Sequence, residues 1–65
     1  MRSDLLDIAG VIHHETAKAI LFSDTDDKEG AVWLPKSAIE YEPAAQRGYH
    51  MVTIPERLAL DKGLI

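Results

Sequence analysis

The sequence has no cysteine, so disulfides, thiolate nucleophiles and zinc sites built on thiolates are excluded. This fits a reducing compartment. Long apolar runs are absent too: the run at residues 19–22 has four members and none is longer, against the ~20 residues that a membrane-spanning helix needs. The first residues lack the apolar stretch of a signal peptide. We therefore expect a cytoplasmic protein that does not insert into a membrane.

Basic side chains are few, with 7 Lys and Arg against 11 Asp and Glu, and the net charge is −4. Proteins that clamp duplex DNA neutralise phosphates with clustered Lys and Arg, and here the basic residues are scattered. The length of 65 residues predicts one domain, residues 1–65, with a small core. Folding of so short a chain buries about 60% of the surface that is exposed when it is unfolded.

Short apolar segments separated by turn residues predict strands at 5–12, 17–23, 31–34, 38–42 and 49–54. Polar residues 13–16 are interpreted as a hairpin connection. Two alternatives stay open: a helix over residues 3–9 capped by Ser3, and one helical turn near Ser37, which has capping-box spacing to Glu40.

A helix is predicted over residues 55–62, because Pro55 suits a first turn, Thr53 and Glu56 have capping-box spacing, and Gly63 is placed as a C-terminal stop. Leu58, together with Leu60 or the stem of Lys62, would face the sheet. The fold class is therefore mostly β with one C-terminal α-helix: a small bent antiparallel sheet or a partly closed SH3-like barrel.

Chemistry-bearing motifs are weak. The acidic loop at residues 24–30 does not fit an EF-hand, because counting from Asp24 places Gly30 seventh and Pro35 twelfth. His13, His14 and Glu15 could ligate a metal, but adjacent residues on a strand point to opposite faces, which makes a poor single site. No nucleophile has a base beside it in sequence, and no glycine-rich phosphate loop is present. We expect no catalytic residues, no metal and no cofactor, hence a protein that is not an enzyme.

The segment at residues 32–37 holds the only tryptophan, Trp33. The favoured interpretation is that Trp33, the largest side chain in a small domain, is the main core residue. The alternative is that Trp33, Lys36 and Tyr41 form a surface that stacks a base or anchors a partner.

Three segments carry a resemblance to a known group: H-E-T-x-K-A-I-L at 14–21, V-W-L-P-K-S at 32–37 and P-E-x-L-A-x-x-K-G-L-I at 55–65. Taken in this order they resemble small, largely uncharacterised proteins of phages and prophages. The chain departs from that pattern at Ala38, where those proteins often have Gln, and at Arg57, where they often have Trp. The resemblance implies a phage accessory context, in the cytoplasm of the host cell, and supplies no catalytic residues.

The first functional hypothesis is a non-enzymatic accessory protein that binds and modulates a host or phage protein, as an anti-CRISPR or anti-restriction inhibitor does, or an inhibitor of a nucleic-acid machine. Acidic side chains would steer it to a basic surface. The predicted partner-binding residues are Asp24, Asp26, Asp27, Glu29, Trp33, Lys36, Glu40 and Glu42.

Two further hypotheses stay open. The alternative function is a small β-barrel that binds single-stranded nucleic acid through Trp33, Lys36, Tyr41 and Tyr49. A homodimer with Leu64 and Ile65 at its interface is compatible with either function.

Overall fold

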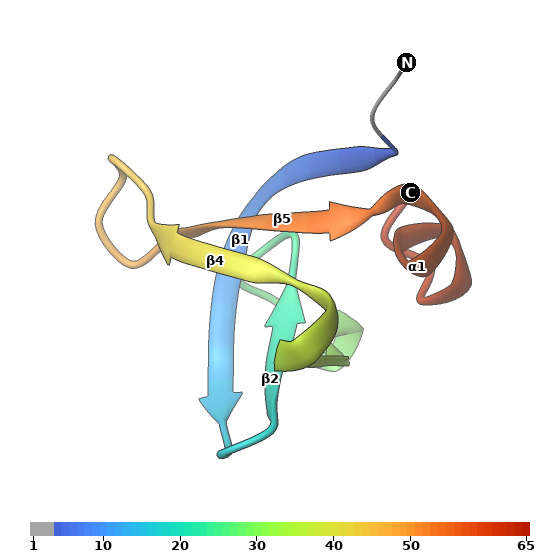
Figure 1. Cartoon of the computed structure of the whole chain (residues 1–65). Helices are drawn as coiled ribbons and strands as arrows, with labels where there is room; N and C mark the ends of the chain where they lie inside the picture. Colours follow the sequence, from blue (N-terminus) through green and yellow to red (C-terminus); the bar gives the residue numbers. More distant parts are fainter. Residues whose placement is uncertain (1–3) are drawn as a thin grey trace.

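The computed structural model describes residues 4–65, which form one open antiparallel sheet of five strands with a short helix at its end (Figure 1). The strands lie in the order β3-β2-β1-β5-β4. In chain order the elements are β1 (Leu5–Glu15), β2 (Ala19–Ser23), η1 (Lys28–Gly30), β3 (Val32–Pro35), η2 (Lys36–Ala38), β4 (Glu40–Pro43), β5 (His50–Pro55) and α1 (Glu56–Asp61). The predicted fold class is confirmed in its first form, a bent sheet that does not close, with one C-terminal helix.

The long strand β1 serves both halves of the sheet. Its first half pairs with β5, from Leu5 opposite Pro55 to Gly10 opposite His50. Its second half, from Val11 onward, pairs with β2. Gly10 stands where the two halves meet and is buried. A Cβ atom at this position would overlap the Ser23 carbonyl oxygen and would lie 2.6 Å from the Phe22 ring. Glycine is therefore required for β1 to cross β2 this closely.

Alternation along the strands builds the core. Ile20, Phe22, Leu34, Val52 and Ile54 have no exposed surface. Their strand neighbours are less buried, as expected for a sheet with one buried face, except at Phe22, which is followed by the buried Ser23. Burial of each such side chain contributes about 1.5–3 kcal/mol. Ile39 and Ala59 complete the buried set and connect η2 and α1 to the sheet.

Several boundaries differ from the sequence-based prediction, and β2, for example, starts at Ala19, two residues later than predicted. The strand β1 continues through residues 13–15, with a bulge between Ile12 and His14, so the connection predicted at 13–16 was wrong for residues 13–15, although β1 and β2 do form the predicted hairpin. The turn begins at Thr16, whose backbone N–H donates to the Ala19 carbonyl (2.8 Å). Residues 36–38 form a 3₁₀ turn, as in the alternative, and β4 starts at Glu40, two residues later than predicted. The alternative helix over residues 3–9 was wrong from residue 5 onward, and Ser3 lies outside the described residues.

The helix α1 was predicted to within one residue at each end. Its stop is confirmed: Gly63 has φ +77°, and the backbone N–H of Leu64 donates to the Ala59 carbonyl (2.8 Å), as in a Schellman motif. The capping box is wrong, because no side chain caps this helix and the Thr53 hydroxyl instead donates to Asp7 Oδ1 (2.7 Å). The Asp4 carbonyl accepts the free Glu56 N–H (2.6 Å) and anchors the helix to the start of β1.

Within residues 4–65, no helix has both the length and the apolar character needed to cross a membrane.

Candidate functional site

Trp33 lies on the outer face of the edge strand β3 and is 44% exposed. The pairing places it opposite Leu21, which in turn is opposite His14. The His14 ring meets the Trp33 indole edge-on, with 6.0 Å between centroids. The interpretation of Trp33 as the main core residue was therefore wrong, because the register gives the buried position of β3 to its neighbour Leu34.

The acidic loop joins β2 to β3 and leads directly into the strand that carries Trp33. All four of its predicted partner-binding residues, Asp24, Asp26, Asp27 and Glu29, are exposed. The loop has internal hydrogen bonds: Asp27 Oδ1 accepts from the Glu29 N–H (2.9 Å), and Thr25 Oγ1 accepts from the Asp27 N–H (3.2 Å). These bonds hold the backbone that carries the acidic side chains in place next to β3.

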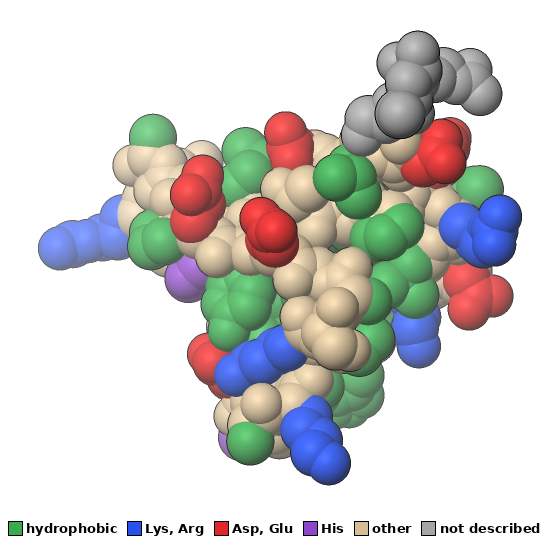
Figure 2. Space-filling view, viewed as in Figure 1, with side chains coloured by type: hydrophobic (Ala, Val, Ile, Leu, Met, Phe, Trp, Pro, Cys, Tyr) green, Lys and Arg blue, Asp and Glu red, His purple; other side chains and the backbone are tan. Residues whose placement is uncertain are grey.

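Glu40 and Glu42 lie on β4, the opposite edge strand of the sheet. Both are exposed, whereas Tyr41 between them is half-buried and packs against the core. Figure 2 shows acidic side chains over β4. The predicted acidic residues therefore form two groups on different elements, one beside β3 and one on β4.

Lys36 and Tyr41 meet at Glu15, a residue that the sequence analysis did not connect with either of them. The carboxylate oxygen Oε2 of Glu15 accepts from Lys36 Nζ (2.6 Å) and from the Tyr41 hydroxyl (3.0 Å). The Lys36 ammonium first, and the Tyr41 hydroxyl second, lower the pKa of Glu15 below its usual value of 4.5. The same bond to Glu15 raises the pKa of Lys36. Hydrogen bonds between side chains thus join three elements: β1, η2 and β4.

The residues of the nucleic-acid hypothesis have different neighbours. Lys36 and Tyr41 are engaged by Glu15, while Trp33 contacts His14 on the outer face. Tyr49 is half-buried at the end of the loop that follows β4.

A buried serine and a histidine are hydrogen-bonded near the bend of β1. Ser23 Oγ lies 2.8 Å from His13 Nε2 and donates its proton to the Thr25 carbonyl. Because a hydroxyl has one proton, His13 Nε2 must be the donor in the first bond. A nucleophile–base pair needs the opposite direction, from hydroxyl to imidazole. This pair therefore fastens the start of the acidic loop to β1, and sequence spacing gave no signal for it.

His50, the third histidine, is half-buried on β5. Its ring lies on the core side of β5, 6.3 Å from the Tyr41 ring, and its Nδ1 is buried without a hydrogen-bond partner among the described residues. Among residues 4–65, no three His, Asp or Glu side chains are grouped as metal ligands.

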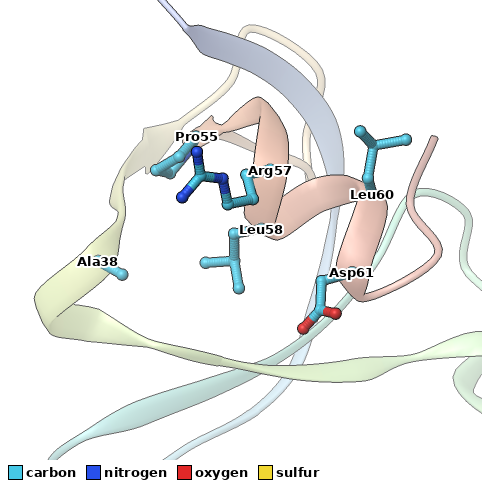
Figure 3. A pocket seen from close by; sticks show the side chains of 6 residues that line it. All are labelled: Ala38, Pro55, Arg57, Leu58, Leu60 and Asp61. Atoms are coloured by element: carbon cyan, nitrogen blue, oxygen red, sulfur yellow. The ribbon is translucent and has the colours of Figure 1, made fainter.

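An apolar groove lies between η2 and α1 (Figure 3). The groove is lined by four apolar and two charged residues: Ala38, Pro55, Leu58, Leu60, Arg57 and Asp61. In Figure 3 the Arg57 side chain extends from the helix toward Pro55. Leu60, expected as a possible contact of the helix with the sheet, is instead 59% exposed, whereas Leu58 packs against the core. The sequence-based prediction did not identify this groove.

Comparison of the chain with protein-family models, with curated proteins and with solved structures found no match. The phage resemblance stays a prediction that rests on the three sequence segments alone.

Proposed function

We propose that the protein is a non-enzymatic binding module whose protein partner docks along the β3 edge. The observation that carries this proposal is the exposure of the single tryptophan, Trp33, on an edge strand. Tryptophan is enriched among the residues that dominate binding energy at protein interfaces, and a partner that covers the indole would remove a large apolar area from water. The edge position adds unpaired backbone groups to which an extended segment can bond.

The charges around Trp33 specify the chemistry of the partner. The acidic loop with Asp24, Asp26, Asp27 and Glu29 precedes β3 directly and carries no competing basic residue other than Lys28. A partner with a basic surface next to an apolar pocket for the indole fits this arrangement. The acidic charges would raise the rate of association, and the indole would set the lifetime of the complex.

The biological form that the sequence resemblance supports is a phage accessory protein that modulates a host or phage protein, such as an inhibitor of a defence system. Such an accessory role requires no catalytic group and no cofactor. It requires an exposed binding surface on a stable fold.

The test compares Trp33→Ala with Ile65→Ala in capture of proteins from lysate of the natural host. Both residues are exposed apolar side chains, and Ile65 (55% exposed) lies beyond α1. We expect Trp33→Ala to lose the captured protein, Ile65→Ala to retain it, and the Trp33 emission of the wild type to shift to the blue in the purified complex. Equal capture by wild type and Trp33→Ala would overturn the proposal.

A second comparison tests the role of the acidic loop. Reversal of Asp26 and Asp27 to lysine should slow association with the captured protein and weaken its salt dependence. Reversal of Glu40 and Glu42 on β4 is the matched control and should have little effect. Quenching of Trp33 by single-stranded oligonucleotide at low salt, with no protein captured, would favour the nucleic-acid hypothesis in its place.

A further inference from the structure

The backbone of Trp33 is oriented to bond to a further strand. Along an antiparallel pair, residues that exchange hydrogen bonds with the neighbouring strand alternate with residues whose N–H and C=O point away from it. The Lys36 N–H donates to the Lys18 carbonyl (2.8 Å) immediately beyond the paired residues of β3, so the bonded positions of β3 are the even-numbered ones. Trp33 therefore directs its N–H and C=O away from β2, to the free edge of the sheet.

The pairing of β2 with β1 gives the same orientation. The Thr16 N–H donates to the Ala19 carbonyl (2.8 Å), so Ala19 directs its backbone polar groups toward β1, and Leu21, two residues further on, does the same. Leu21 is the residue opposite Trp33. Two independent hydrogen bonds thus indicate that the Trp33 backbone has no partner in β2.

The positions on either side of Trp33 offer less to an added strand. Pro35 has no N–H, and the Ala31 N–H donates to the Lys28 carbonyl (3.1 Å). Within the described residues, Trp33 thus supplies the one free N–H of the β3 edge. An added strand exchanges a pair of bonds at Trp33 and finds acceptors alone beyond it, which limits the bound segment to roughly five residues.

The β4 edge has a similar backbone but presents the other face of the sheet. The Ala44 N–H donates to the Tyr49 carbonyl (2.9 Å), so by the same alternation Tyr41 directs its N–H and C=O to the free edge of β4. A residue added opposite Tyr41 would place its side chain on the inner face, beside the ring that is bonded to Glu15. A residue added opposite Trp33 places its side chain on the outer face, beside the exposed indole.

The surroundings of Trp33 specify that side chain. The acidic loop ends directly before β3, and its exposed carboxylates attract a cation. An arginine guanidinium is also attracted to an indole ring on which it stacks. Arginine therefore satisfies both features of this edge.

We propose that the partner binds as a sixth strand: an extended segment of roughly five residues, antiparallel to β3, with one arginine opposite Trp33 and a second beside the acidic loop. This inference rests on the proposed function and names the kind of segment that the β3 edge takes. Antiparallel pairing is the arrangement of the four strand pairs described. The residues flanking the first arginine lie opposite Val32 and Leu34, which belong to the core cluster, and are therefore apolar.

The probe is a blocked pentapeptide with threonine first, valine second and fourth, and arginine third and fifth. It is titrated at low salt against the emission of Trp33, the single tryptophan. Three full-length chains are compared: the wild type and two synthetic chains in which the amide of Trp33 or of Tyr41 is replaced by an ester. Each ester removes one edge N–H, keeps the side chain and weakens the preceding carbonyl, which is bonded within the sheet, so the two chains are matched.

We expect the wild type and the Tyr41 ester to bind the peptide equally, and the Trp33 ester to bind about two- to tenfold more weakly, because one hydrogen bond is lost. In the complex the Trp33 amide should exchange its hydrogen with solvent more slowly than in the free chain. A peptide with glutamate in place of both arginines should not bind. Circular dichroism of each ester chain checks that the fold is retained.

Three results would overturn the proposal. One is an unchanged Trp33 emission at the highest soluble concentration of the arginine peptide. Another is equal binding by the two ester chains, and the third is equal binding of the glutamate peptide. A Trp33 amide that is already protected in the free chain, with a dimer in sedimentation, would assign the edge to a second copy and would overturn it too.

Capture from host lysate separates this inference from the proposed function. If Trp33→Ala loses the captured protein while the Trp33 ester holds it as tightly as the wild type, the proposed function stands and the added strand is wrong. If Trp33→Ala retains the captured protein, the proposed function itself is wrong.

Discussion

The two edge strands of the sheet are protected from unwanted pairing to different degrees. The β4 edge carries two exposed carboxylates, Glu40 and Glu42, and it ends at Pro43, which has no N–H to donate. Charge and proline are the usual devices that keep a strand edge from pairing with another chain. The β3 edge has one proline, Pro35, and presents an exposed indole at Trp33. The β4 edge thus carries more of these protecting features than the β3 edge, which agrees with the proposal that a partner docks along β3.

Their central aromatic residues also differ. Tyr41 on β4 faces inward, packs on the core and donates to Glu15. Trp33 on β3 faces outward, and its ring contact is with His14. One aromatic side chain therefore serves the fold and the other is free to serve binding. The predictions below test these separate roles of Tyr41 and Trp33, and the first concerns Gly10, where the two halves of the sheet meet.

Gly10→Ala should destabilise the whole sheet, including both edge strands. The new methyl group would overlap the Ser23 carbonyl and the Phe22 ring, both buried, so β1 could not keep its bend between the two halves of the sheet. We expect a loss of about 3 kcal/mol or more in the free energy of unfolding, measured by urea denaturation. Gly30→Ala is the control, since open space surrounds that position, and it should stay near the wild type. Equal stability of the two variants would contradict the close packing at Gly10.

Tyr41→Ala should destabilise the protein by about 2 kcal/mol, because it removes a half-buried ring and the hydroxyl bond to Glu15. Urea denaturation measures the loss. Tyr41→Phe separates the two contributions, since it keeps the ring and should lose about 1 kcal/mol. A Tyr41→Ala variant as stable as the wild type would mean that the inward aromatic residue does not support the fold.

Trp33→Ala should change the free energy of unfolding by less than about 1 kcal/mol, since the side chain is 44% exposed and makes one edge-on ring contact. Denaturation followed by circular dichroism provides the measurement, because the variant has no tryptophan emission. A loss equal to that of Tyr41→Ala would show that both aromatic residues serve the fold and would remove the contrast between the edges.

The smallest expected effect is a pH dependence at Glu15. Lys36 and Tyr41 lower its pKa in the folded protein, so the carboxylate stabilises the fold above its usual pKa of 4.5. That contribution is lost as the pH falls through the lowered folded value. We expect Glu15→Gln to be slightly less stable than the wild type at neutral pH, with the difference shrinking as the pH falls below 4.5 and vanishing below the lowered folded pKa. A difference that grows on acidification would contradict the assigned ion pair.

Local signals in the sequence predicted most of the fold. Alternating apolar residues located the strands, and Gly63 located the end of α1, because both depend on neighbours within a few residues. The position of Trp33 was not predictable in this way. Side-chain size favoured the core, whereas the actual face depends on which residue of β2 lies opposite, and Leu21 rather than Ile20 takes that place. Register is set by the whole sheet.

The candidate site was predicted in part. The exposed acidic loop and the exposed pair on β4 follow from composition, but their separation onto opposite edges follows only from the strand order. The bond between Tyr41 and Glu15 joins residues 26 positions apart, and no spacing rule covers such a contact. The groove beside α1 was not predictable either, because it forms only when folding places Ala38 of η2 next to the helix.

The pairing of β1 with β5 has a consequence for how the chain acquires its structure. Leu5 bonds across to the strand that ends at Pro55, and the first N–H of α1 is satisfied by Asp4. During synthesis the first half of β1 must wait until β5 has been made, and until then its backbone has no β5 strand to pair with. Contacts of such long sequence separation fold slowly compared with local ones. The hairpin of β1 and β2 can form early, so its bend at Gly10 is available as the template on which the later strands and the helix assemble.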